Sequence, residues 1–135
     1  MAGFRYAYRE SGGTPTIQSA VFQDSETLTK GDMVSIESGK ADLSATNDTT
    51  LAGVALETKA GTTNVSYITF IADTDAVYAV DDAVARLNGA TLDIAGATGA
   101  MTVASSSNVD VQVVADSSAT EPTLVRIAHG EQYKN

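Results

Sequence analysis

The sequence predicts an all-β protein, built as a small barrel or as a sandwich. Ala, Thr, Ser, Val, Gly and Asp dominate it, whereas the Lys, Glu, Leu, Gln and Arg that fill exposed helices are scarce. Short β-branched or alternating apolar runs recur, separated by turn residues about every ten positions. The 135 residues are close to the usual size of one domain, and no cysteine is available for a disulfide or a thiolate metal site.

Residues 1–15 are predicted to form an extended N-terminal arm, and residues 16–135 a single β domain. Three aromatic residues and two arginines alternate in this arm before a Gly-Gly break. They are Phe4, Arg5, Tyr6, Tyr8 and Arg9. Period-two alternation would place the aromatics on one face of a strand and the arginines on the other. Two interpretations stay open: an arm that uses these five side chains to contact a neighbouring subunit or partner, or an ordinary first strand with its aromatics in the core.

The strands of the domain are expected in quick succession after residue 16. The expected ranges are 16–23, 33–38, 51–56, 65–72, 76–80, 91–94, 101–103, 109–113 and 124–128. The run at 51–56 is apolar throughout and predicts a strand buried on both faces, where Gly53 permits a close approach of backbones. In the run at 109–113, valines alternate with polar residues, which is typical of a half-buried strand.

At most one short helix is expected, at about 81–88. This segment begins with two aspartates and is followed by Asn88-Gly89, the pattern of a helix start and stop. It is long enough for one or two turns only.

The charge of the chain excludes several partners. Its net charge is -9, and binding to nucleic acid or to an anionic membrane requires clustered Lys and Arg. No apolar run reaches the length of a membrane span, and the start of the chain is too polar for a signal peptide. We therefore expect a protein that is made in a cytoplasm and binds neither nucleic acid nor membrane.

No catalytic, metal or cofactor site is expected. The only histidine, His129, lies near the end of the chain and is interpreted as exposed and idle. The pairs Asp73/Asp75 and Asp81/Asp82 are the only carboxylate clusters, and Asp-Thr-Asp resembles the start of a calcium loop. The glycine and glutamate that complete such a loop are missing, so turn-forming and helix-capping roles are favoured. The protein is predicted not to be an enzyme.

Three segments carry a resemblance to a known family. The stretch Phe70–Val80 resembles an "ADxDxVFxV" pattern of head and coat-associated proteins of tailed phages. The stretch Leu28–Ile36, followed by Leu51–Ala55, is similar to the "aGdvV…GVA" arrangement of small capsid decoration (cement) proteins. The sequence departs from the cement pattern in its aromatic arm and in the separation of its two halves.

The resemblance implies a β-barrel-like or β-tulip-like fold without enzyme activity. It implies a virion protein, made in the host cytoplasm, that binds the major capsid protein on the outer surface of the mature head and stabilises it. Family members are commonly homotrimers, sometimes dimers, and by analogy the contact falls to Phe4, Arg5, Tyr6, Tyr8 and Arg9. Alternatives are a head-completion, tail or fibre domain of a phage, or a carbohydrate-binding or adhesion domain. The missing tryptophan argues against the last of these.

Overall fold

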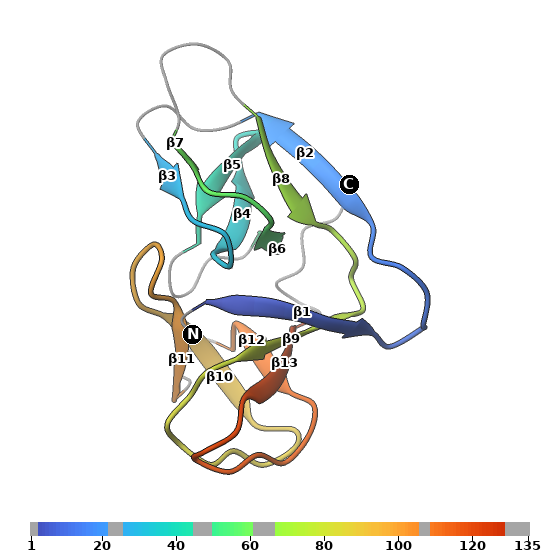
Figure 1. Ribbon diagram of the computed structural model, residues 1–135, viewed down its shortest axis with the longest axis vertical. Helices are drawn as coiled ribbons and strands as arrows, with labels where there is room; N and C mark the ends of the chain where they lie inside the picture. The colour runs from blue at the N-terminus through green and yellow to red at the C-terminus, as the bar shows by residue number, and fades with distance from the viewer. Residues whose placement is uncertain (1–2, 22–25, 45–49, 61–66, 106–108, 129–135) are drawn as a thin grey trace.

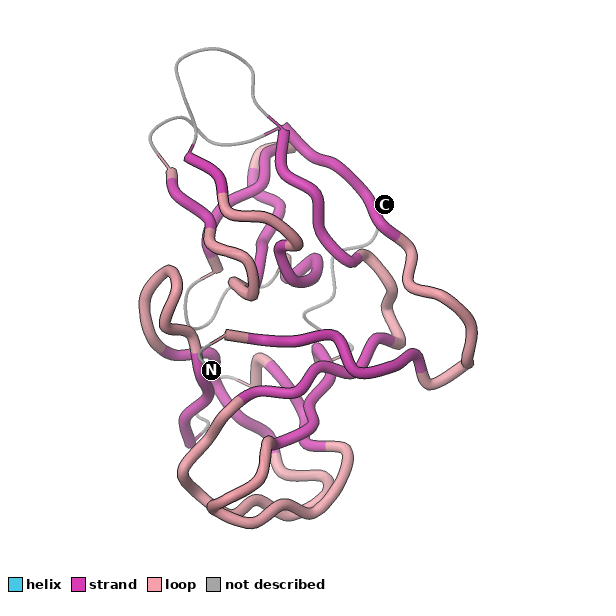
Figure 2. The backbone as a smooth tube through the Cα atoms, viewed as in Figure 1, coloured by secondary structure: helices cyan, strands magenta, loops and turns pink. Residues whose placement is uncertain are grey.

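The computed structural model describes residues 3–21, 26–44, 50–60, 67–105 and 109–128. Across these residues the chain consists of short strands joined by turns and loops, without a helix (Figure 2). The predicted all-β class is therefore confirmed. No described segment forms a helix long and apolar enough to cross a membrane. His129 lies outside the described residues.

A six-stranded antiparallel sheet forms one layer of the described chain, at the bottom of Figure 1. Its strands, in spatial order, are β1 (Phe4–Arg9), β9 (Ala76–Val80), β13 (Thr123–Ile127), β12 (Val111–Val113), β10 (Thr91–Ala95) and β11 (Thr102–Ser105). Strand β1 is the edge nearest the second layer and crosses the molecule between the two layers (Figure 1). The described part of the predicted arm is thus a strand of the domain's own sheet.

A five-stranded antiparallel sheet forms the second layer. Its strands, in spatial order, are β2 (Ile17–Val21), β8 (Tyr67–Ile71), β6 (Leu51–Ala55), β4 (Met33–Glu37) and β5 (Lys40–Leu43). The sheet curls until its edge strands β2 and β5 come into contact, but they share no ladder in the described residues. A two-stranded ribbon of β3 (Thr27–Leu28) and β7 (Lys59–Ala60) lies beside it. Since neither sheet closes, the architecture is a sandwich rather than a barrel.

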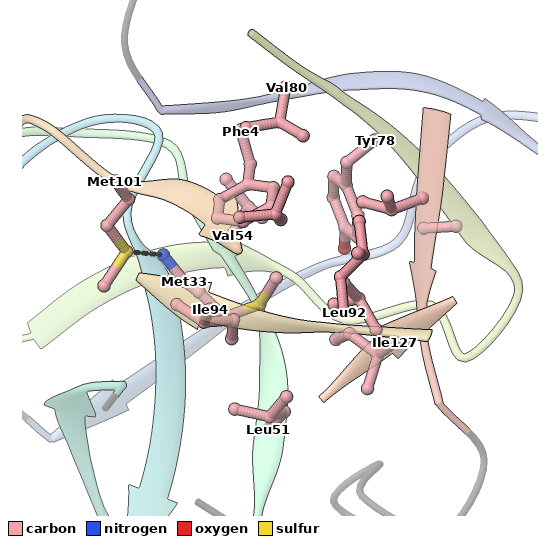
Figure 3. Packing of buried hydrophobic residues seen from close by; sticks show 14 of the residues in the cluster. Phe4, Met33, Leu51, Val54, Tyr78, Val80, Leu92, Ile94, Met101 and Ile127 are labelled. Carbon is pink, nitrogen blue, oxygen red and sulfur yellow. Dashed lines mark hydrogen bonds between the residues drawn. The ribbon is translucent and has the colours of Figure 1, made fainter. Parts of the chain in front are cut away.

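Two hydrophobic clusters form the core of the described chain. The larger cluster lies between the sheets and includes Phe4, Tyr78 and Ile94 from one layer and Leu51 and Val54 from the other (Figure 3). The smaller cluster fills the curl of the five-stranded sheet. Its buried members are Leu28, Val34, Ile36, Ala41, Ala52, Ala55, Ile68 and Phe70.

Strand β6 separates the two clusters, as the apolar run at 51–56 predicts. Leu51 and Val54 belong to the larger cluster, whereas Ala52 and Ala55 belong to the smaller one. Between them, Gly53 approaches β8 so closely that an added Cβ would lie 1.5 Å from the backbone oxygen of Ile71. Both expectations for this strand, burial on its two faces and a close approach at the glycine, are confirmed.

The segment at 81–88 is not helical, which corrects the candidate helix. The side chains of Asp82 and Arg86 form an ion pair of 2.7 Å at the i,i+4 spacing that a helix would also produce. The backbone of Arg86, however, exchanges two hydrogen bonds with Ser117, of 3.2 and 2.9 Å. A partner thirty-one residues away therefore takes the backbone groups that a helix would have used.

The strand expected at 109–113 begins only at Val111. Val109 has a φ of 64°, in the left-handed region, and its side chain is 40% exposed. Its amide donates to Asp93 Oδ1 (3.1 Å). A β-branched residue with positive φ cannot continue a strand. The alternation predicted for this run therefore holds only from Val111 to Val113.

Candidate interaction surface

The five side chains predicted to form a contact lie on β1, where a β-bulge divides them. Residues Phe4 to Tyr6 pair with Val80 to Tyr78 in order, but Tyr8 pairs with Val77, so Ala7 is the extra residue. Phe4 and Tyr6 consequently face the core, whereas Tyr8 faces outward and is 45% exposed. The expectation that all three aromatics share one face is wrong, because the bulge reverses the alternation after Tyr6. Phe4, at 2% exposed, packs in the core.

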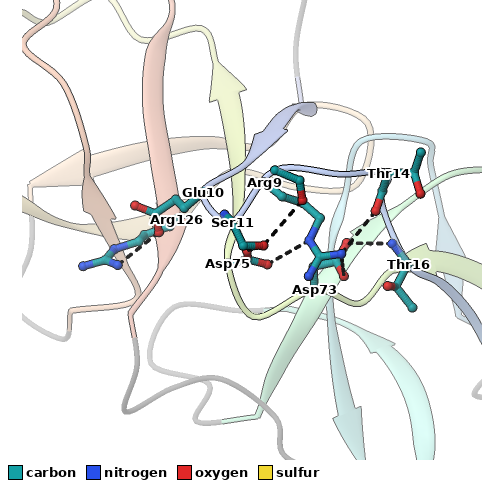
Figure 4. A network of polar contacts seen from close by, with 9 residues as sticks. Arg9, Glu10, Ser11, Thr14, Thr16, Asp73, Asp75 and Arg126 are labelled. Atoms are coloured by element: carbon teal, nitrogen blue, oxygen red, sulfur yellow. Dashed lines mark hydrogen bonds and ion pairs between the residues drawn. The ribbon is translucent and has the colours of Figure 1, made fainter.

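The two arginines of β1 are tied to different parts of the six-stranded sheet. Arg5 Nη2 contacts Asp81 Oδ1 at 3.0 Å, just beyond the end of β9. Arg9 Nε contacts Asp75 Oδ1 at 3.0 Å, and its Nη1 lies 3.5 Å from Asp73 Oδ1 (Figure 4). Both cations thus hold β1 to its neighbour within the same chain. The contact role assigned to Phe4, Arg5, Tyr6, Tyr8 and Arg9 stays a prediction.

Asp73 and Asp75 also fix the loop that leads from β1 to β2. Asp75 Oδ2 accepts the amide of Ser11 (3.0 Å) and its hydroxyl, while Asp73 Oδ2 accepts the amide of Thr16 (2.7 Å) (Figure 4). The hydrogen bonds from Ser11, followed by that from Arg9, lower the pKa of Asp75 to about 2. The Asp-Thr-Asp turn therefore clamps residues 9–16, a role that sequence reasoning missed because its partners lie about sixty residues away.

The two halves of the cement-like pattern meet in space. The amide of Gly31 donates to the carbonyl of Ala55 (3.0 Å), and the amide of Ala55 donates to the carbonyl of Asp32 (2.8 Å). The buried carboxylate of Asp32 accepts the amides of Thr29 (2.8 Å) and Gly99 (2.9 Å). These residues form a joint between the start of β4, the end of β6 and the β10–β11 hairpin, so their role in this structure is architectural.

A groove of about 590 Å³ opens beside β1, between it and strands β6 and β8. Its apolar lining on this side comes from Val54, Ala55 and Ile71 of the five-stranded sheet and from Leu56, just after β6. Its described charged lining consists of Arg5 and Lys30, with no carboxylate. We call this feature the β1 groove. A cationic lining is unusual on a chain whose 17 acidic residues outnumber its 8 basic ones.

The described side chains include no group of three or more His, Cys, Asp or Glu residues placed to hold a metal ion. The carboxylates closest in sequence are instead engaged in hydrogen bonds and ion pairs with the protein. Asp81 contacts Arg5, and Asp82 contacts Arg86. The helix-capping role predicted for this pair is wrong, because no helix follows it.

Comparison with known proteins gives a relationship of structure alone. No family model matches the chain, and no curated protein matches it by sequence. The fold is similar to the crystal structure of the head fibre gp8.5 N base in bacteriophage phi29, with a TM-score of 0.53. The match covers 86% of this chain and 98% of that chain, at 12% sequence identity. At this identity the finding concerns the fold: this chain has the fold of the phi29 head-fibre base.

Proposed function

We propose that this chain is a structural protein of a tailed-phage virion, which binds the outer surface of the mature head and stabilises it as a decoration protein. The observation that carries this proposal is the match of fold to a head-fibre base over nearly the whole of both chains. Fold alone does not define function. The cement-like segments supply a second, independent line of support, because they concern sequence rather than backbone geometry.

The structure is suited to a load-bearing role. Among the described residues, the loop after β1 and the turn before β4 are held by hydrogen bonds from backbone amides to Asp75, Asp73 and Asp32. Asp32 accepts two amides, and Asp73 and Asp75 accept one each; charge-assisted hydrogen bonds of this kind stabilise the turns between strands. In the proposed role the partner is the major capsid protein, and the protein works without enzymatic chemistry. A homotrimer is the favoured assembly, with a dimer as the alternative.

A second candidate is the base of a head fibre, since the matched structure is such a base by its own description. Both candidates place the chain on the head, and copy number separates them. A decoration protein accompanies the coat protein around the whole shell, whereas a fibre base occupies only the sites that carry fibres. Quantitative mass spectrometry of purified virions measures this ratio directly.

The proposal is tested with heads of the phage that encodes the chain. Purified protein is mixed with mature heads lacking it and with precursor shells, and each mixture is sedimented. We expect saturable co-sedimentation with the mature heads and weak association with the precursor. Antibody labelling of intact virions should mark the head. Labelling confined to the tail, or no binding to mature heads, would contradict the proposal.

A further inference from the structure

Part of the outer edge of β1, the side away from β9, has backbone groups without a hydrogen-bond partner among the described residues. On the side away from β9, the amide of Phe4 donates to the carbonyl of Gly31 (2.8 Å). At the other end, the carbonyl of Arg9 accepts the amide of Gly12 (3.0 Å). Backbone hydrogen bonds within the chain thus occupy both ends of this edge. They do not occupy the stretch between the two ends.

Tyr6 lies in this open stretch, and the pairing pattern sets the direction of its backbone groups. In an antiparallel ladder, successive residues turn their N–H and C=O alternately toward and away from the partner strand. Since the N–H of Phe4 points away from β9, the backbone N–H and C=O of Arg5 point toward β9, and those of Tyr6 point away from it. In the described part of the chain, no residue bonds to the backbone N–H or C=O of Tyr6 on this side. An unpaired N–H and C=O remain there, beside the β1 groove.

The groove next to this edge has the lining that an added strand needs. Val54 and Ile71, each 2% exposed, form its buried floor, and the half-buried Leu56 and Tyr6 supply its accessible apolar surface. Lys30, whose side chain is exposed, lies beside Gly31 at the end of the groove where Phe4 is held, whereas Arg5 is already paired with Asp81. In a strand that pairs with Tyr6, alternate side chains would lie on its two faces, one face toward the apolar lining, and Lys30 would stand at one end of it.

We propose that the β1 groove receives an extended segment of a partner protein in which apolar and acidic side chains alternate, and that this segment pairs with the backbone of Tyr6. Strand addition of this kind obtains affinity from main-chain hydrogen bonds and specificity from alternate side chains. The acidic character follows from charge complementarity with the exposed Lys30, since Arg5 is already paired with Asp81. The inference rests on the proposed function, under which the segment belongs to the coat protein.

Strand β11, the other edge of the six-stranded sheet, contributes no residue to the β1 groove. The two edges of the five-stranded sheet are less open to an added strand. Strands β2 and β5 lie against each other where the sheet curls, so each strand covers part of the other's free edge. Beside β1, by contrast, a backbone stretch without a partner among the described residues, an apolar lining and the exposed Lys30 coincide. This coincidence carries the proposal, since none of the three features alone would select a partner.

The first test measures the charge requirement on mature heads with the full chain. Lys30→Glu is expected to weaken head binding at least tenfold, because it places a carboxylate beside the acidic segment. The matched control is Lys40→Glu, the same charge change at the β4–β5 hairpin, where binding should stay within twofold of the wild type. Circular dichroism and urea midpoints verify that both variants fold. Equal binding of the three proteins would overturn the proposal.

The second test measures whether the Tyr6 amide forms a hydrogen bond with the partner segment. Hydrogen exchange with residue-level fragmentation is followed for the free and the head-bound protein, and the Tyr6 amide should exchange at least tenfold more slowly when bound. Unchanged exchange at Tyr6, even with Lys30-dependent binding, would mean docking through side chains only and would overturn strand addition. Slowing in the free protein that grows with concentration would identify a second copy as the occupant, against the proposal.

These outcomes separate the two proposals. If wild-type protein fails to bind mature heads, the decoration function fails, and the groove proposal fails with it. If the wild type binds but neither Lys30→Glu nor the Tyr6 amide responds, only the groove proposal is refuted. Binding lost in Lys30→Glu together with slowed exchange at Tyr6 supports both.

Discussion

Gly53 lies where β6 runs closest to β8, and the space that it leaves is too small for any side chain. In a Gly53→Ala variant the Cβ would lie 1.5 Å from the backbone oxygen of Ile71, whereas ordinary contacts begin at 3.4 Å. The strands would have to move apart by about 2 Å, which breaks hydrogen bonds of ordinary length. Because Val54 and Ile71 are each 2% exposed, the freed groups would stay away from water.

The free energy of unfolding that Gly53→Ala loses follows from the number of backbone hydrogen bonds next to the glycine. The pairs of Val54 with Ile71 and of Ala55 with Phe70, and the bond from Leu56 to Thr69, lie next to the glycine. Two or three buried hydrogen bonds lost at about 1–2 kcal/mol each give a loss of about 4 kcal/mol. Since domains of this kind are stable by about 5–15 kcal/mol, this loss is a large share of the total.

Urea denaturation followed by circular dichroism measures the effect. Gly12→Ala is the matched control, because nothing lies within 4 Å of its added Cβ and only its φ of +80° is unfavourable. That left-handed strain is worth about 1–2 kcal/mol. If Gly53→Ala loses no more free energy of unfolding than Gly12→Ala, the close approach of β6 and β8 is refuted.

Three further predictions concern single residues. Asp75, with its pKa lowered to about 2 from an ordinary 3.8, stabilises the fold above that ordinary value; stability should fall as pH drops from 3.8 toward 2, and Asp75→Asn should flatten this part of the curve of urea midpoint against pH. Asp32→Ala removes a buried carboxylate that accepts hydrogen bonds from Thr29, Thr98 and Gly99, and should lower the free energy of unfolding by about 3 kcal/mol; a loss below about 1 kcal/mol would contradict the joint. Val109→Asn should raise the free energy of unfolding by ~1 kcal/mol, and with it the thermal midpoint, because asparagine tolerates a φ of 64°; an unchanged or lower midpoint would show that Val109 is not strained.

Local pattern predicted most strands because burial follows the alternation of side chains along a strand. The run at 65–72 became β8 (Tyr67–Ile71), and the run at 51–56 became the doubly buried β6. The two-residue strands β3 and β7 were missed, since so short a pair has no periodicity of its own. The segment at 81–88 was misjudged because local helix signals cannot register the distant Ser117.

The candidate surface was predicted only in part. Composition selected residues 4–9 as a distinct aromatic and basic strand, and the structure makes them the edge of a sheet. The bulge at Ala7 could not be predicted, because it depends on the register with β9. The groove beside the strand also has no signal in the sequence, since its lining comes from three segments that are distant along the chain.

By itself, the sequence determined that this protein is all-β, acidic and without cysteine, and that Gly53 stands at a close approach of two strands. These properties follow from residue type and from short-range alternation. The tertiary structure alone decided which carboxylates clamp the loop after β1 and which backbone groups of Tyr6 have no partner in the part of the chain that the structure describes. Such properties depend on register and on partners about sixty residues away, and antiparallel strands far apart in the chain define both only when the sheets assemble.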